Sequence, residues 1–272
     1  MSQITHMQLP GTWDHFSAYY ERFAEPITSR FGSALARQLG IVAGARVLDV
    51  AAGSGALALE LAREGAQVTA IDHSPAMIAR IAERAATDGL DGAVQGLAMD
   101  GQALTFADGA FDVALSVFGV MMFPDHEAGL REMIRVTRPG GKIGLAIWRE
   151  AGGAGPALLM RKAMLDLFPD RPLAPMPKGH EEWRHPDRLA TSLRSAGLTD
   201  ISIEPMSVDW TFPSPSWLAE QAPHLFAVMP IWSAADAATR AMLIDHMVRQ
   251  LGETEDPIIP SPATLTTAVK PG

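Results

Sequence analysis

The sequence predicts an α/β protein built on a doubly wound, mostly parallel β-sheet. Between residues 46 and 148, short runs rich in β-branched residues alternate with segments whose apolar residues recur every three or four positions. The run at 111–117 is almost continuously apolar, which is typical of a parallel strand covered on both faces. A glycine-rich turn follows the first of these strands. Because strands joined by helices nearly always form right-handed crossovers, this alternation predicts a doubly wound, Rossmann-like sheet.

Two helices are predicted ahead of the sheet. Apolar and aromatic residues between positions 12 and 31 recur at spacings of three or four, and Pro26 interrupts the pattern. We therefore expect an N-terminal helical cap over residues 1–40. The residues of the stripe are Trp13, Phe16, Tyr20, Phe23, Ile27 and Phe31.

The elements of the sheet follow in order. Ser74 and Pro75 supply an N-cap and a first-turn proline for one helix. Pro139, Gly140 and Gly141 end another helix and turn the chain into the fifth strand. The predicted strands are 46–50, 67–71, 93–99, 111–117 and 142–148, and the predicted helices are 56–63, 75–89 and 127–136.

The pattern changes after Trp148. Glycines at 152, 153 and 155 precede a predicted helix at 156–168 and a proline-rich stretch at 169–177, which indicates an insertion or lid. The remaining predictions are a helix at 186–197, a strand at 201–210, helical material over 216–251 and a short β-favouring run at 263–269.

The amino-acid composition excludes several classes of partner and chemistry. The chain has 272 residues, a formal net charge of -9 and a pI near 5.3, so nucleic acid and anionic membranes are disfavoured as partners. The absence of cysteine excludes disulfides, thiolate catalysis and cysteine-ligated zinc. The N-terminal residues do not form a signal peptide, and no apolar run approaches the roughly 20 residues that span a bilayer. We expect a cytoplasmic protein.

The segment 49–55 reads Asp-Val-Ala-Ala-Gly-Ser-Gly and predicts a nucleotide-binding loop. Gly53 and Gly55 let backbone N–H groups and a helix N-terminus approach a cofactor. With Ala58 in third place and Asp72 on the next strand, the loop also satisfies the fingerprint of NAD-binding enzymes. The loop alone leaves both cofactors open.

Asp49 favours one of them. It lies inside the first strand, where a dinucleotide fold usually has an apolar residue, and a buried acid is costly without a partner. Segment 47–55 resembles the first motif of class I S-adenosylmethionine-dependent methyltransferases, whose acid helps hold the loop and, directly or through water, the methionine amino group. Ala51 stands where that family commonly has glycine. The resemblance implies S-adenosyl-L-methionine as cofactor and S-adenosyl-L-homocysteine as product.

Further segments match the same family in order. Segment 70–74 resembles the second motif, whose acid, here Asp72, accepts hydrogen bonds from the ribose hydroxyls. Segment 98–101 resembles the stretch whose aspartate, here Asp100, accepts from the adenine amine. Segment 116–119 implies contact with the methionine part, and 138–141 matches a structural turn. The predicted cofactor-binding residues, with Met77 on the adenine side and Tyr20 closing over the cofactor, are Tyr20, Asp49, Ala51, Gly53, Gly55, Asp72, His73, Met77, Asp100, Gly101 and Val117.

The resemblance covers roughly 13–148 and is closest to the small-molecule branch that includes ubiquinone and menaquinone biosynthesis methyltransferases. It implies a seven-stranded sheet that ends in an antiparallel pair, with strand six near 201 and an antiparallel strand seven near 263. We therefore expect one methyltransferase domain over 1–272, with a cap at 1–40, a cofactor-binding core at 41–148 and a substrate or lid region at 149–272.

The acceptor is less well defined. Dense aromatics and methionines in 13–20, 148–183 and 217–232, among them Met160, Met164, Phe226 and Met229, favour an apolar or aromatic metabolite. No catalytic base is assigned, because we expect surface or helix-capping roles for His126, His180 and His185. No metal-ligand spacing is visible, so we predict metal independence.

Two alternatives stay open beside small-molecule methyl transfer. One is an NAD-dependent oxidoreductase, which the glycine loop alone permits but Asp49 and Asp100 disfavour. The other is a cofactor-binding protein of methyltransferase fold without transfer activity. A nucleic-acid methyltransferase is disfavoured, because segment 116–119 lacks the Asn/Asp-Pro-Pro-aromatic sequence that grips a flipped base. The sequence leaves the oligomeric state open.

Overall fold

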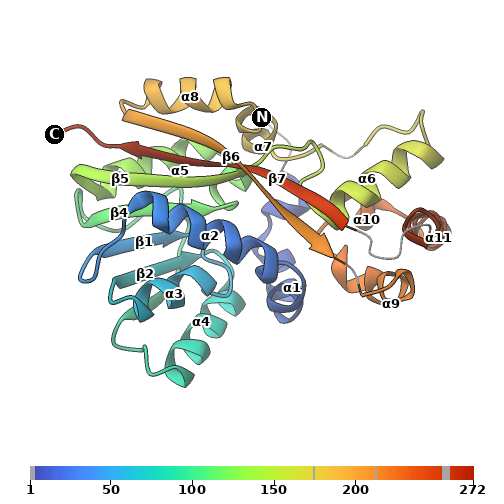
Figure 1. Ribbon diagram of the computed structural model, residues 1–272, viewed down its shortest axis with the longest axis horizontal. Helices are drawn as coiled ribbons and strands as arrows, with labels where there is room; N and C mark the ends of the chain where they lie inside the picture. Colours follow the sequence, from blue (N-terminus) through green and yellow to red (C-terminus); the bar gives the residue numbers. More distant parts are fainter. Residues whose placement is uncertain (1–3, 174, 212, 253–257) are drawn as a thin grey trace.

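The computed structural model describes residues 4–173, 175–211, 213–252 and 258–272, so parts of the predicted ranges 1–40 and 149–272 lie outside the described residues. A single sheet of seven strands runs through the molecule in the order β3-β2-β1-β4-β5-β7-β6 (Figure 1). Its strands are β1 (Arg46–Val50), β2 (Gln67–Asp72), β3 (Val94–Ala98), β4 (Phe111–Val117), β5 (Thr137–Trp148), β6 (Thr199–Thr211) and β7 (Ile258–Val269).

Strand β7 alone reverses direction. The pairs from β3 across to β5 are parallel, whereas β7 runs antiparallel to both β5 and β6. This confirms the predicted Rossmann-like sheet with an antiparallel last strand. The carboxyl ends of β1, β2, β4 and β5 therefore meet at one edge, where ligands bind in sheets of this kind.

The prediction for the start of β5 is wrong by five residues. The strand begins at Thr137 rather than at 142, and the segment of Pro139, Gly140 and Gly141 lies within it as an irregularity in the pairing with β4. Gly140 donates its N–H to the carbonyl of Lys270, so the segment is held by strand-like bonds instead of forming a separate turn.

Helices cover both faces of the sheet. Figure 1 shows α2, α3 and α4 in front of the strands and α5 behind them, as right-handed crossovers require. Two short 3₁₀ helices, η1 (His6–Gln8) and η2 (Val120–Met122), are also present. The α-helices are α1 (Pro10–Phe23), α2 (Glu25–Leu39), α3 (Ala56–Arg63), α4 (Pro75–Thr87), α5 (His126–Val136), α6 (Pro156–Leu167), α7 (Lys178–Trp183), α8 (Pro186–Ser195), α9 (Pro215–Leu225), α10 (Pro230–Ala234) and α11 (Ala237–Gly252).

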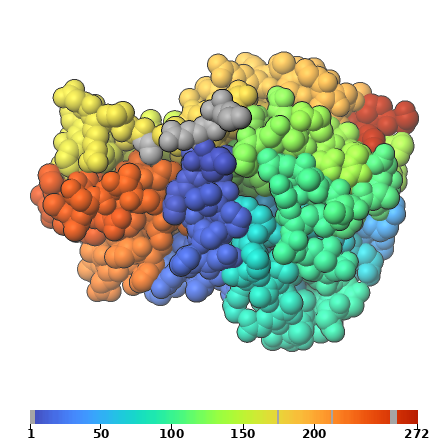
Figure 2. Space-filling model, turned by 180° about the vertical axis from the view of Figure 1, so that it is seen from behind, coloured from blue at the N-terminus to red at the C-terminus, as the bar shows by residue number. Residues whose placement is uncertain are grey.

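The apolar interior has two parts. The larger cluster surrounds the sheet, and a second cluster joins α1 with the helices that follow β5, mainly α6, α9 and α11. Figure 1 shows α6, α9, α10 and α11 gathered at one end of the molecule, and Figure 2 shows the N-terminal residues, in blue, between that group and the core. None of the described helices is long and apolar enough to cross a bilayer.

Candidate functional site

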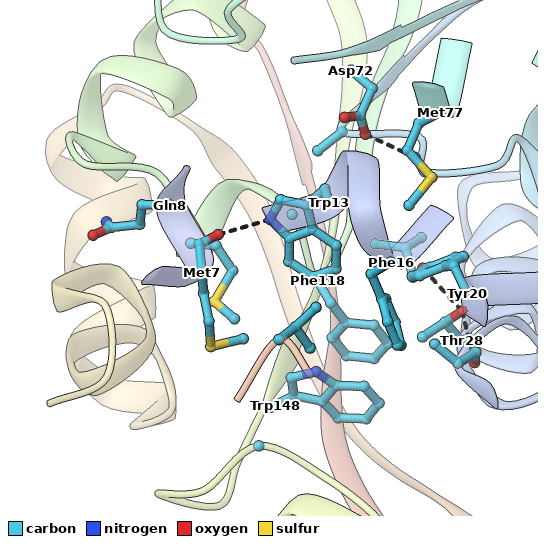
Figure 3. Close-up of a pocket in the computed structure, with 18 of the residues that line it drawn as sticks. Met7, Gln8, Trp13, Phe16, Tyr20, Thr28, Asp72, Met77, Phe118 and Trp148 are labelled. Atoms are coloured by element: carbon cyan, nitrogen blue, oxygen red, sulfur yellow. Dashed lines mark hydrogen bonds between the residues drawn. The ribbon is translucent and has the colours of Figure 1, made fainter. Parts of the chain in front are cut away.

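A cavity of about 430 Å³ opens at the carboxyl ends of the parallel strands, and its walls include residues of α1 and of the C-terminal helices. Nine of the eleven predicted cofactor-binding residues line it: Tyr20, Ala51, Gly53, Asp72, His73, Met77, Asp100, Gly101 and Val117. Figure 3 labels Tyr20, Asp72 and Met77 among them. Asp49 instead lines a small cavity of about 30 Å³, which shares Tyr20, Thr28, Ala51 and Val117 with the larger one. Gly55 lines neither cavity.

Asp72 holds the glycine loop. Its carboxylate accepts the N–H of Gly53 at 3.0 Å on one oxygen and the N–H of Ser74 at 2.9 Å on the other. The side chain lies at the end of β2 and is only 7% exposed. Burial raises the pKa of Asp72, and the two backbone donors oppose that rise. The carboxylate thus fixes the loop and still borders the large cavity.

Asp49 is a buried acid to which no described residue donates a hydrogen bond. It lies in β1 and is 2% exposed. Burial, and then the charge of Asp72, raise the pKa of Asp49 to about 7. An unpaired carboxylate beside a cavity is costly in the free protein and favours a ligand that carries a cation.

The glycine loop contains two demanding backbone positions. Gly53 has a φ of 57°, and a Cβ there would lie 3.2 Å from Cε1 of Tyr20, so this ring closes over the loop. Gly55 has a φ of 83°, and a Cβ there would lie 2.8 Å from Cγ1 of Ile81 in α4. The absence of a side chain at Gly55 therefore permits close packing of α4 on the loop, and its predicted backbone contact with the cofactor stays a prediction.

Ala51 adopts a left-handed conformation, with a φ of 58°, at the position where the resembled family commonly has glycine. An L-residue in this region is strained by about 1–2 kcal/mol. The methyl group of Ala51 also fills the place that a Cβ on Gly119 would need. The alanine in the loop therefore requires a glycine after β4.

The third predicted acid, Asp100, is exposed at the rim. One carboxylate oxygen accepts both the backbone N–H and the side-chain amide of Gln102, each at 2.9 Å. Gly101 beside it is buried, and a Cβ there would lie 2.6 Å from the ring of Phe123. Asp100 therefore presents a charged group where the backbone approaches the cavity closely.

Charged contacts tie the N-terminal helices to α4. The Asp14 carboxylate in α1 accepts the hydroxyl of Ser74 at 2.5 Å and the N–H of Ala76 at 3.2 Å. Glu21 pairs with Arg80 in α4 at 2.8 Å. These contacts hold α1 across the mouth of the site and place Tyr20 over the glycine loop.

The rest of the cavity is apolar and aromatic. Phe118, at the end of β4, has a φ of 62°, and its ring stacks on Trp148 with a centroid separation of 3.4 Å and an interplanar angle of 3°. A strained residue at such a place is common in ligand sites. Figure 3 shows both rings beside Trp13 and Phe16 of α1. Burial raises the pKa of Tyr20 to about 12, so Tyr20 is unsuited to act as a base near neutral pH.

Sequence reasoning identified this region in part. Phe226 and Met229 line the cavity as expected, whereas Met160 and Met164 are buried in the second apolar cluster. Trp210 and Ser261, which also line it, were missed as site residues. Both lie on the last two strands, and only the alternation of residues along a strand could have indicated which side chains face the site.

The expectation for two histidines is wrong. His126 and His180 are 2% and 0% exposed, because α7, which the sequence did not predict, packs against α5 and η2. Burial lowers the pKa of His126, and it lowers that of His180 to about 4. Nε2 of His126 lies 3.1 Å from a Glu182 carboxylate oxygen. His185 occupies the N-cap position of α8 without a capping bond from its side chain.

His126, Glu127 and Glu182 could each offer one ligand atom to a metal, and these atoms lie within 4.8 Å of one another. None of the three lines the large cavity. Lys178 lies 3.5 Å from Glu182, so an ion pair already occupies part of this group. The geometry therefore gives this group of three side chains no role in the large cavity.

A family model described as a methyltransferase domain matches residues 47–141. An uncharacterised protein of Mycobacterium tuberculosis is 44% identical over 136 residues, which cover 50% of this chain and 49% of that protein. The chain thus matches about half the length of this relative.

A demethylmenaquinone methyltransferase of Corynebacterium urealyticum is 31% identical over 174 residues, which cover 61% of this chain and 72% of that enzyme. Among solved structures, that of the [4+2]-cyclase SpnF has a TM-score of 0.53 at 24% identity and covers 90% of this chain and 82% of its own. This last likeness concerns the fold alone.

Proposed function

Because the chain belongs to the class I S-adenosylmethionine-dependent methyltransferases, we propose that it transfers a methyl group from S-adenosyl-L-methionine to a small, apolar or aromatic acceptor. One observation carries the proposal. The carboxylates of Asp72 and Asp100 line the same cavity as Gly53, the walls of that cavity are otherwise largely apolar, and Asp49 lies in the small cavity beside it.

The residues fit this cofactor. Asp49 is an unpaired buried acid that suits a cationic amino group, and Asp72 and Asp100 keep acceptor capacity for ribose hydroxyls and for the adenine amine. We propose that Tyr20 and Met77 pack against the nucleoside. Bound S-adenosylmethionine supplies a methyl group already activated by the sulfonium charge, so the proposal needs no metal.

The chain's own contribution to transfer is positioning and exclusion of water. We assign no general base among the described residues that line the cavity. Orientation alone can lower the barrier of a displacement by about 7–11 kcal/mol. The acceptor is then a nucleophile that needs little help with deprotonation. The net charge of -9 supports a small-molecule acceptor over nucleic acid.

Calorimetric titration with S-adenosylhomocysteine and with NADH tests the cofactor. We expect binding of S-adenosylhomocysteine only, and an Asp72→Ala variant should bind it roughly 10 to 150 times more weakly, about 1.5–3 kcal/mol. Since Asp72 also holds the loop, Asp100→Ala serves as a second variant whose exposed position leaves folding intact. Unchanged affinity in both folded variants, or tight binding of NADH instead, would refute the assignment.

Methyl transfer needs a separate test, because a similar fold does not establish the reaction. One protein of similar fold is named a [4+2]-cyclase. The protein, incubated with methyl-labelled S-adenosylmethionine and a metabolite extract, should move the label to a small apolar compound. A label that never leaves the cofactor, despite binding, would favour the binding-only alternative.

A further inference from the structure

Ser261 is a buried hydroxyl in the wall of the large cavity. It is 0% exposed, and its Oγ has no hydrogen-bond partner among the described residues. Leaving a buried hydroxyl unpaired destabilises a protein, because its hydrogen bonds to water are lost and not replaced. A methyl group would avoid this penalty, as Ala263 shows two residues further along the same face of β7. Because Ser261 also lines the cavity, a ligand bound there is a partner within reach of this hydroxyl.

The register of the last strands places Ser261 between two tryptophans. Ala263 pairs directly with Trp148 of β5, and Ile259 pairs directly with Trp210 of β6. Direct cross-strand partners point to the same face of a sheet, and so do residues two apart on one strand. Ser261 therefore shares a face with both indole rings, which also line the cavity.

The surroundings of this hydroxyl are apolar and tightly fixed. A Cβ on Gly155 would overlap the ring of Trp210, so that the glycine lets the chain before α6 lie directly on the indole. Trp148 stacks on Phe118, which follows Val117 at the end of β4. The two tryptophans thus extend from the part of the cavity where we place the methionine of the cofactor toward Ser261.

We propose that Ser261 forms a hydrogen bond with a carbonyl or hydroxyl oxygen on a planar, otherwise apolar acceptor whose ring lies between Trp148 and Trp210. This inference rests on the proposed function. It narrows the substrate class to ring compounds that carry an oxygen, and it makes Ser261 a positioning residue that selects for that oxygen.

The strand supplies a matched control. Thr264 and Thr266 are also buried, and their hydroxyls also lack partners, but they project to the opposite face of β7 and do not line the cavity. Ser261→Ala and Thr264→Val each remove one unpaired hydroxyl from the same strand. Neither should lower the melting temperature, whereas a hydroxyl with a structural role would lower it when removed.

The test uses two ring compounds of the same shape, 1-naphthol and 1-methylnaphthalene, which differ in one hydroxyl. Their dissociation constants are measured by tryptophan fluorescence, with and without saturating S-adenosylhomocysteine. The ratio of the two constants cancels the common apolar contacts. In Ser261→Ala we expect the binding of 1-naphthol, relative to that of 1-methylnaphthalene, to be about tenfold weaker than in the wild type. In Thr264→Val we expect the ratio of the two dissociation constants to stay unchanged.

An unchanged ratio in Ser261→Ala, an equal shift in both variants, or binding of neither compound to the wild type would overturn the inference. Binding of S-adenosylhomocysteine is recorded for all three proteins in the same series. Its absence in the wild type would instead count against the proposed function, so the two failures are distinguishable.

Discussion

At the scale of single residues, the two acids beside the glycine loop have opposite surroundings. Asp72 receives two backbone N–H groups, whereas Asp49 receives none from the described residues. Both side chains are buried, but only Asp72 has donors that stabilise its charge. The carboxylate form of Asp49 is therefore less stable than that of Asp72. The pKa of Asp49, raised to about 7, makes the charge of this residue dependent on pH near neutrality.

Asp49→Asn should change how stability depends on pH. The folded pKa of about 7 lies above the ordinary aspartate value of 3.8, so the wild type loses stability as pH rises from about 4 to about 7. The variant lacks this loss, and we expect its stability relative to wild type to be about 2–4 kcal/mol greater at pH 8 than at pH 4. Urea unfolding at both values measures it.

A second acid serves as a control of opposite sign. The side chain and backbone N–H of Arg46, with Arg138, hold the pKa of Asp112 well below its usual range. Asp112→Asn should therefore remove stability that is present above about pH 4 and is lost as pH falls. If Asp49→Asn showed the same trend as Asp112→Asn, the unpaired state of Asp49 would be contradicted.

At the scale of elements, the cap depends on charged contacts between two helices and α4. The guanidinium of Arg84 in α4 donates to both carboxylate oxygens of Glu25 in α2, at 2.7 and 2.9 Å, and to the carbonyl of Ser54 at 3.1 Å. The Ser54 hydroxyl donates to the same carboxylate at 2.5 Å. The glycine loop is thus connected to both α2 and α4.

Arg84→Ala should lower the free energy of unfolding by about 1–2 kcal/mol and weaken S-adenosylhomocysteine binding, because it leaves the half-buried Glu25 with the Ser54 hydroxyl alone and removes the guanidinium donor of the Ser54 carbonyl. Arg63→Ala, which removes the more exposed pair with Asp88, should cost less than about 0.5 kcal/mol. Thermal unfolding and calorimetry compare the two. Equal losses would mean that burial does not distinguish these pairs.

At the scale of the whole molecule, the site lies between two apolar clusters. Phe16 and Phe23 of α1 belong to the helical cluster, although the chain continues directly into α2, which packs on the sheet. Trp210 contacts both clusters. The N-terminal cap and the region after β5 therefore stabilise each other, which supports the single domain proposed for 1–272.

Unfolding in urea should accordingly be one cooperative transition. Circular dichroism at 222 nm reports all helices, and tryptophan fluorescence reports both clusters through Trp183 and Trp232. We expect the two curves to coincide, with a midpoint that rises when S-adenosylhomocysteine is added. Two separated transitions would show that the helical cluster unfolds independently of the sheet.

Local sequence patterns were sufficient for much of the core. The strands at 46–50 and 111–117 and the helix at 56–63 agree with the structure, because periodicity, glycines and capping residues act over a few neighbouring positions. Helix α7 was missed, since its six residues are too few for a periodic signal. The burial of His126 and His180 was missed for the same reason, because it depends on the packing of α7.

The sequence by itself determined the alternation of strands and helices from β1 to β5, the glycine loop and the three acids, because each is encoded in residues close together along the chain. Only the tertiary structure decided which side chains share the cavity. It packed α4 against Gly55, left Asp49 without a hydrogen-bond donor among the described residues, and placed Ser261 of the last strand on the same face as Trp148 and Trp210. The physical reason is that burial and hydrogen bonding depend on neighbours distant in sequence, and those neighbours are fixed by strand register and helix packing.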